Sequence, residues 1–320
     1  MKNACASSKL RAVATRWGAR LGDSPNGPYT KMIRVGICLL AIILFLSPQA
    51  VSAGQTAVER GMKFFREGNY QEAMKSFHVS RPRDLNKEAY MAWGLSAFRL
   101  GKFQSALLKL EKAFKIDPAD GNLLTLIAQC QLNLQKPLEA LKNLRATEKL
   151  KVSDRGEAYF LWAVSAGLAG SHEEAIEKFQ SALALKPDKE FEIRLGMADS
   201  LKELKLLDQA GEQAERALRL RPGDPLGMER LGLIHLKMGR YGEAERMFDD
   251  LVRVNPNSAV NQYNLACVRA RLGKQAEACV SLKSAFAFGL DRASAMNDED
   301  LAGLKEADCF KELMKEPPRR

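Results

Sequence analysis

The sequence predicts an all-α fold, a solenoid of stacked antiparallel helix pairs that ends in C-terminal capping helices. Three observations support this prediction. Apolar residues return every three or four positions along most of the chain, which is the period of a helix. A small residue recurs seven times at spacings of 33 to 35 residues, and an alanine follows each of them after twelve positions. A glycine lies between these two positions in five of the seven units, where one helix must end before the next begins.

The first element, residues 1–53, is predicted to be an export signal. Residues 35–46 form an uncharged run, which suits a signal-peptide core of roughly 7–15 residues but is short for a membrane span of about 20. Pro48 ends this run, and the small residues that follow predict cleavage after Ala53. We expect the true start to be Met32, which gives a more compact signal. The alternative interpretation is an uncleaved anchor in the inner membrane.

Both interpretations place the folded part of the chain in the periplasm or cell envelope, because a Lys/Arg cluster before an apolar segment stays in the cytoplasm. The chain has a net charge of +10, of which residues 1–53 supply +6, with seven Lys and Arg against one Asp. The remaining 267 residues therefore carry a net charge of only +4. A nucleic-acid-binding solenoid would need a basic groove, so this balance argues against that class of protein.

Seven repeat units follow the signal, over residues 54–292, and each is expected to form two helices. The unit boundaries are 54–86, 87–120, 121–155, 156–190, 191–224, 225–258 and 259–292. The repeated alanines are Ala73, Ala106, Ala140, Ala175, Ala210, Ala244 and Ala278. The small residue of the first helix and the alanine of the second can face each other where the two backbones are closest, so a large side chain there would cost about 1–3 kcal/mol. One hairpin cannot bury its apolar face alone, so the units must stack.

These units resemble the tetratricopeptide repeat (TPR) family. The clearest copy, residues 87–120, has the family's pattern at Trp93, Gly94, Phe103, Ala106, Leu110, Ala113 and Pro118. The resemblance implies a right-handed superhelix whose inner groove is lined by the first helix of each pair. Two copies depart from the pattern at the turn between helices, where Gln135 and Lys205 replace the glycine.

Residues 293–320 are too short for a second domain. Asp298 to Leu301, followed by Leu304, Phe310 and Leu313, predicts an amphipathic helix pair. Such a pair resembles the cap that ends TPR arrays by covering the apolar face of the last repeat. The final residues, 317–320, are expected to be a frayed tail.

The sequence contains none of the motifs GxxxxGK[ST], HExxH or GxSxG, and its three histidines lie far apart. The cysteines beyond the signal form no CxxC pair, so we expect neither a metal nor a cofactor. They are Cys130, Cys267, Cys279 and Cys309. A disulfide is possible in an oxidising compartment, although the resemblance points Cys267 into the groove and Cys279 outward. Glu174 and Lys178, four residues apart on a second helix, are expected to form a solvated ion pair.

The resemblance implies a protein-binding groove along the first helices, and in the first four repeats that surface is mostly apolar. Its candidate partner-binding residues are Met62, Phe65, Met91, Leu95, Phe98, Leu132, Phe160, Val164 and Leu168. A solvent-exposed apolar surface of this kind is typical of an interaction site. The alternative is a superhelix wound tightly enough to bury these side chains against one another. The same positions in the later repeats, Asp199, Lys202, Tyr263, Cys267 and Arg271 among them, are of mixed polarity.

The sequence therefore predicts a non-enzymatic scaffold or adaptor of the cell envelope that binds one or more proteins. We expect no nucleic acid partner, and membrane contact only through the N-terminal segment if it stays uncleaved. The alternative function is a regulatory subunit stably bound to an envelope enzyme or to a secretion or polysaccharide-export machine.

Overall fold

The structure, a computed structural model, describes residues 49–315, with side chains from Ala57 onward except that of Pro187. The predicted signal core at residues 35–46 and the predicted frayed tail lie outside the described residues. The chain divides into two compact units, Met1–Leu85 and Asn86–Arg320. In the first unit, helix α3 (Gln49–Arg66) pairs with α4 (Tyr70–His78), and the short helix η1 (Pro82–Asp84) follows. Helix α3 extends across the cleavage position predicted after Ala53.

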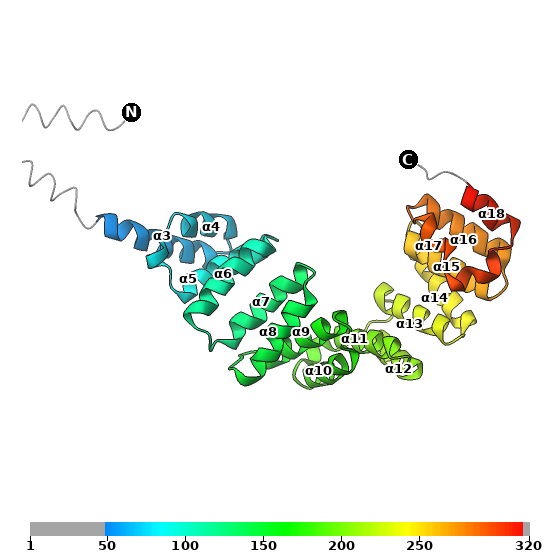
Figure 1. Cartoon of the computed structure of the whole chain (residues 1–320), viewed down its shortest axis with the longest axis horizontal. Helices are drawn as coiled ribbons and strands as arrows, with labels where there is room; N and C mark the ends of the chain where they lie inside the picture. Colours follow the sequence, from blue (N-terminus) through cyan, green and yellow to red (C-terminus); the bar gives the residue numbers. More distant parts are fainter. Residues whose placement is uncertain (1–48, 316–320) are drawn as a thin grey trace, which may run out of the picture. The chain divides into compact units, whose positions relative to one another are not determined.

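The second unit contains six further antiparallel pairs, which follow one another along the chain (Figure 1). Each first helix packs on its own second helix, and each second helix packs on the first helix of the next pair. The pairs are α5 (Lys87–Arg99) with α6 (Phe103–Ile116), α7 (Gly121–Asn133) with α8 (Pro137–Ala146), α9 (Arg155–Leu168) with α10 (His172–Leu185), α11 (Glu190–Glu203) with α12 (Leu207–Leu220), α13 (Pro225–Lys237) with α14 (Tyr241–Val254), and α15 (Ala259–Arg271) with α16 (Gln275–Ala287). Short 3-10 helices η2 (Thr147–Lys149) and η3 (Pro187–Lys189) join two of them. The described residues form no strand, so the predicted all-α solenoid is confirmed.

The repeated alanines explain how closely the helices of a pair approach. All seven, from Ala73 in the first unit to Ala278 in the last repeat, have an exposed fraction of 0%. The approach is close enough that some positions accept only glycine. A Cβ atom added to Gly94 would lie 2.7 Å from the Leu110 side chain, and one added to Gly196 would lie 2.3 Å from the Phe179 ring. The close packing predicted from the repeat spacing is therefore present in the structure.

The turn between helices keeps one geometry even where the glycine is replaced. Gly101 has a φ of +70°, and Gln135 and Lys205 adopt nearly the same left-handed conformation, with φ of +58° and +63°. The backbone hydrogen bonds are also retained, since the amide of Gln135 donates to the carbonyl of Leu132 at 3.0 Å as the amide of Gly101 does to Phe98 at 2.9 Å. A side chain in this conformation costs roughly 1–2 kcal/mol, so the surrounding turn imposes it on both residues.

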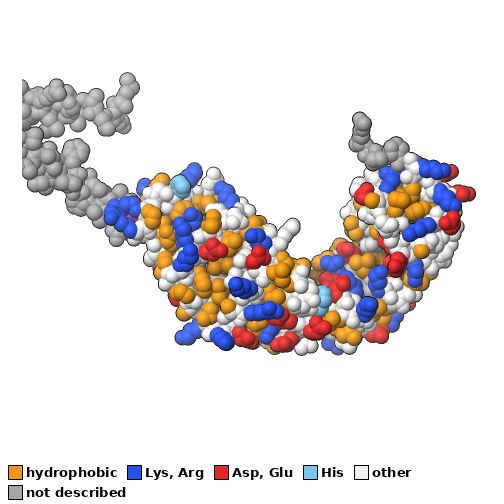
Figure 2. Space-filling model, viewed as in Figure 1, with side chains coloured by type: hydrophobic (Ala, Val, Ile, Leu, Met, Phe, Trp, Pro, Cys, Tyr) orange, Lys and Arg blue, Asp and Glu red, His pale blue; other side chains and the backbone are white. Residues whose placement is uncertain are grey.

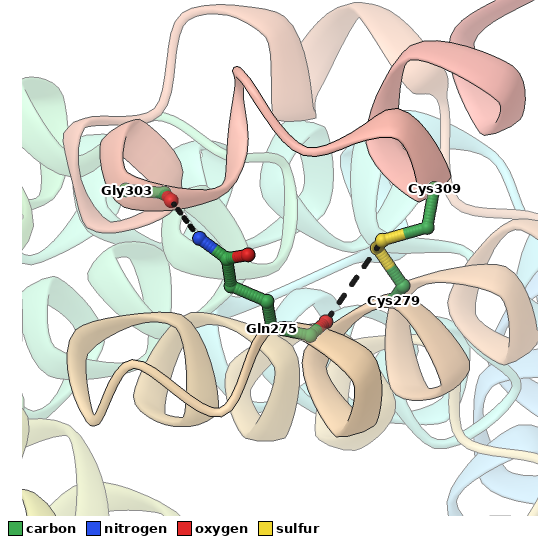
Figure 3. Close-up of a disulfide and its surroundings, with 4 residues drawn as sticks. All are labelled: Gln275, Cys279, Gly303 and Cys309. Atoms are coloured by element: carbon green, nitrogen blue, oxygen red, sulfur yellow. Dashed lines mark hydrogen bonds between the residues drawn. A yellow bond between two sulfur atoms is a disulfide. The ribbon is translucent and has the colours of Figure 1, made fainter.

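The C-terminal cap consists of α17 (Arg292–Met296), η4 (Glu299–Leu304) and α18 (Asp308–Lys315). Its first predicted helix is thus a 3-10 helix, which packs on α15. Leu301 and Leu304 have exposed fractions of 0% and join the core of the last repeat, as the amphipathic pattern predicted. A disulfide between Cys279 and Cys309 ties α18 to α16, and the Gln275 side-chain amide donates to the carbonyl of Gly303 at 3.2 Å beside it (Figure 3).

The sequence expectation for Glu174 is wrong. Glu174 does not form a solvated pair with Lys178. Its carboxylate instead accepts hydrogen bonds from Arg145 on α8 (2.9 Å) and from the indole of Trp162 on α9 (2.8 Å). Lys178 is nearly buried, pairs with Glu177 at 2.9 Å and lies 4.5 Å from the centre of the Trp162 ring. The Arg145 guanidinium is the main reason that the pKa of Glu174 is lowered. Glu174 therefore links α10 to α8 and α9 instead of lying on a solvated face of α10.

Candidate protein-binding groove

The predicted groove residues all lie on first helices, and none of them belongs to the buried core. In the first unit, Met62 and Phe65 lie on α3 and are half-buried, with the Phe65 ring 6.2 Å from that of Tyr70. In the second unit the candidates lie on three consecutive first helices, α5, α7 and α9. They are Met91, Leu95, Phe98, Leu132, Phe160, Val164 and Leu168.

The neighbouring positions on α5 show how the helix separates these side chains from the core. Trp93 and Ala97 are buried between the helices of the pair, while Met91, Leu95 and Phe98 are half-buried on the remaining face. Leu168, at the end of α9, is the most open of the candidates, with 66% of its surface exposed. The other candidates are only partly buried, and Leu132, Phe160 and Val164 also pack against the core around α9. Their role in holding a partner stays a prediction.

Two of the aromatic candidates are held in place by neighbours from their own repeat. The Phe98 ring meets that of Phe103 edge to face at 5.3 Å. The Phe160 ring lies 6.2 Å from Phe179, and the ammonium group of Lys189 lies 4.5 Å from its centre. Aromatic contacts of this kind contribute roughly 0.5–1.5 kcal/mol each. Both rings are therefore packed against their own repeat in the absence of a partner.

A cavity of about 400 Å³ opens where the apolar part of the surface ends. Its apolar side is formed by Val164 and Leu168 from the predicted set, with Phe179 beneath them. Gly167 lines the cavity and has no side chain to fill it, whereas the corresponding positions of the two preceding repeats carry Phe98 and Leu132. This cavity was not predicted from the sequence. The signal was present, since a glycine stands at a groove position where the two preceding repeats have a large apolar residue.

The opposite side of the cavity is charged. Asp199 pairs with Arg230 at 3.0 Å and with Lys202 at 3.7 Å, and Lys202 also pairs with Glu203 at 3.3 Å. The four charges balance, so the rim can accept hydrogen bonds from a bound chain and donate hydrogen bonds to it without favouring one sign of charge. A bound segment could place an apolar side chain in the cavity and satisfy its backbone polar groups at this rim.

The end of the surface is covered by the chain's own cap. Asp298 accepts a hydrogen bond from the hydroxyl of Tyr263 at 2.5 Å, and the Cys267 thiol lies 3.9 Å from the same carboxylate. Burial is the main reason that the pKa values of this phenol and this thiol are both raised. Asp300 pairs with Lys237 at 3.3 Å and with Arg271 at 3.9 Å. Tyr263, Cys267 and Arg271 were predicted to face the open groove, but the cap contacts all three.

Within residues 49–315, no group of three or more His, Cys, Asp or Glu side chains could hold a metal ion. No helix in this part of the chain is long and apolar enough to cross a membrane.

Similar proteins identify the repeats. Family models described as tetratricopeptide repeat match residues 87–120, 125–190 and 229–281. Among solved structures, a TPR protein from Parabacteroides merdae has a TM-score of 0.57 at 17% identity, covering 79% of this chain and 99% of that one. PilF of Pseudomonas aeruginosa has a TM-score of 0.52 at 20% identity, covering 69% and 97%. At these identities the structures show a shared fold only.

Two curated relatives are more similar in sequence. DnaJ homolog subfamily C member 3 of Gallus gallus is 24% identical over 63% of this chain and 39% of its own length. Hsp70-Hsp90 organizing protein 1 of Glycine max is 25% identical over 70% of this chain and 41% of its own length. The chain thus spans about two fifths of these relatives. Tetratricopeptide repeat proteins act as protein-interaction scaffolds and are typically non-catalytic. The chain belongs to the tetratricopeptide repeat family.

Proposed function

We propose that this protein is a non-enzymatic scaffold of the cell envelope that holds a segment of a partner protein against its first helices. The observation that carries the proposal is the run of accessible apolar side chains on α5, α7 and α9, which leads into the cavity beside Leu168. Leu168 is exposed and the other side chains of the run are partly buried, so a partner could cover the apolar surface that they still present. The typically non-catalytic character of TPR proteins supports a binding function rather than catalysis.

Two features support the envelope location. The N-terminal segment has the charge, apolar core and small residues of an export signal. The Cys279–Cys309 disulfide would persist in an oxidising compartment, whereas cytosolic thiols are kept reduced. Trapping thiols with a maleimide in intact cells, followed by mass spectrometry, measures the state of this pair. An oxidised pair in a protein protected from external protease by the outer membrane supports the location, and a fully reduced pair contradicts it.

The groove is tested by site-specific photo-crosslinking in cells, with probes at Phe98 and Leu168. A matched control probe replaces Val254, an apolar residue on the second helix α14 that is 76% exposed. The proposal expects the same protein to be captured from Phe98 and Leu168 but not from Val254. Capture from all three positions, or from Val254 alone, would show that the groove is not the binding surface.

A substitution in the groove then tests whether these side chains contribute to the affinity for the partner. Leu168→Glu places a charge at the mouth of the cavity, and because the side chain is already open to solvent the fold should be unaffected. We expect at least a tenfold loss of partner affinity, since a buried apolar contact is replaced by a carboxylate without a partner. Val254→Glu makes the same chemical change elsewhere and should bind normally. Equal affinity of the two variants would refute the groove.

A further inference from the structure

The outer faces of the second helices differ in charge along the chain. Over the helix bounds alone, the net charge is +2 on α6 and +1 on α8, and with their flanking residues the stretches 102–116 and 136–151 each carry +3. The next three second helices are acidic, with net charges of −2 on α10, −1 on α12 and −2 on α14. We call the first two stretches the basic outer face. Its lysines are Lys102, Lys109, Lys112, Lys115, Lys136, Lys142, Lys149 and Lys151.

The lysines of the basic outer face are not neutralised by the protein. Other basic residues of these repeats are paired, Lys87 with Asp117 at 3.0 Å and Arg145 with Glu174, but among the described residues no carboxylate lies within ion-pair distance of these eight ammonium groups. Lys109 instead lies 4.0 Å from the centre of the Trp93 ring. Burial lowers the pKa of Lys109, and the like charge of Lys112 lowers it further. The positive potential here is available to an external anion.

Apolar side chains are interleaved with these charges. Leu108, Lys112 and Lys115 share one face of α6 by their spacing of four and three residues, and Leu138 and Lys142 are four residues apart on α8. Leu108 is 51% exposed and Leu138 is 67% exposed. Figure 2 shows hydrophobic side chains over α6 to α8 on the face in view, with Lys and Arg and also Asp and Glu side chains among them.

This combination fits a bilayer better than a polyanion in solution. Exposed leucines beside lysines are typical of surfaces that rest in the interface of an anionic membrane, with the leucines entering the acyl boundary. Nucleic-acid surfaces instead combine basic residues with aromatic platforms on which bases stack, and the aromatic rings here are covered by Lys109 and Lys112. The positive charge and the exposed leucines therefore both favour an anionic membrane as the partner.

We propose that the basic outer face binds the anionic phospholipid headgroups of a membrane, with Leu108 and Leu138 entering its interface. The sequence alone limited membrane contact to an uncleaved N-terminal segment, and the folded repeats now supply a second contact. The surface lies on second helices, so it leaves the groove of the first helices free. The inference goes beyond the proposed function and does not require the groove to bind anything.

The test is co-sedimentation of the full chain with mixed phosphatidylglycerol–phosphatidylcholine vesicles and with pure phosphatidylcholine vesicles, at low and high salt. The test variant is Lys112→Glu with Lys142→Glu. The matched control, Arg219→Glu with Lys283→Glu, makes the same change in net charge at two exposed residues of α12 and α16 outside the basic outer face. All proteins share residues 1–53, so any contribution of that segment is common to them.

Each lysine near an anionic surface contributes roughly fivefold in affinity, so we expect the test variant to bind phosphatidylglycerol vesicles about thirtyfold or more weakly than the unmodified chain. The control variant and Leu168→Glu should bind as the unmodified chain does, and the binding should weaken at high salt. Circular dichroism checks that both double variants are folded. The proposal would be overturned if the test and control variants bound the vesicles equally, or if the protein bound vesicles with and without phosphatidylglycerol equally. Binding to poly-glutamate or heparin but not to vesicles would place a soluble polyanion there and would also overturn it.

Discussion

The disulfide gives the sharpest prediction about stability. Cys279 and Cys309 are 30 residues apart, so the bond closes a loop of about 31 residues that contains the whole of α17 and η4. In the chain-entropy account, closing a loop of this length removes roughly 12 cal/mol/K from the unfolded ensemble, which corresponds to about 3.7 kcal/mol at 25 °C. Reduction of the bond should therefore destabilise the last repeat and its cap by about 3–4 kcal/mol.

The assay compares the protein with and without a reductant, by urea unfolding and by hydrogen exchange of the amides in residues 292–315. Because each repeat contacts mainly its neighbours, we expect faster exchange in the cap and the last repeat and little change in the middle repeats. The double variant Cys279→Ser with Cys309→Ser is the control, since it should match the reduced protein and ignore the reductant. Unchanged exchange in residues 292–315 after reduction would refute the reasoning, because the other cap contacts would then suffice.

Three further predictions follow from single positions. Lys205→Gly should raise the unfolding free energy by about 0.5–1 kcal/mol, because glycine relieves the left-handed backbone at some cost in chain entropy, and a lowered urea midpoint would contradict this. Gly196→Ala should destabilise by about 1–2 kcal/mol through its clash with Phe179, whereas Gly167→Ala, whose new Cβ meets its nearest neighbour at an ordinary 3.5 Å, should be neutral or stabilising in the same assay. Burial lowers the pKa of His235, so the neutral imidazole contributes its full stabilisation above about pH 6.5, and this contribution is lost as the pH falls through the pKa of the folded protein. Between pH 7.5 and 5 the urea midpoint of His235→Gln should therefore drop less than that of the unmodified protein. Equal drops in the two proteins would contradict this prediction.

The repeat spacing predicted most of the fold, because each repeat is a local unit whose packing recurs. The burial of every repeated alanine and the position of each turn could be placed by register alone. The turns at Gln135 and Lys205 show how strong this constraint is, since they keep the glycine conformation without the glycine.

Contacts between repeats and contacts of the cap were harder to predict. Glu174 was paired with Lys178 because spacing within one helix was the only guide, whereas its actual partner Arg145 comes from the preceding repeat. Cys309 lies beyond the last repeat, so no register placed it opposite Cys279. The cavity beside Leu168 depends on the missing side chain of Gly167, and a missing atom is easily overlooked in a pattern of apolar residues.

The cap also sets a limit on the reach of any ligand. Asp298 and Asp300 occupy the inner surface of α15 and reach Lys237 at the end of α13, so in the second unit the open surface runs only from α5 to α13. Neighbouring helices in such arrays are about 8–10 Å apart, so these five first helices span roughly 32–40 Å. An extended chain advances about 3.3–3.6 Å per residue, so the surface accommodates a segment of about nine to twelve residues. A segment bound along this surface as proposed would meet the folded cap at α15, and the cap would limit how far the segment extends.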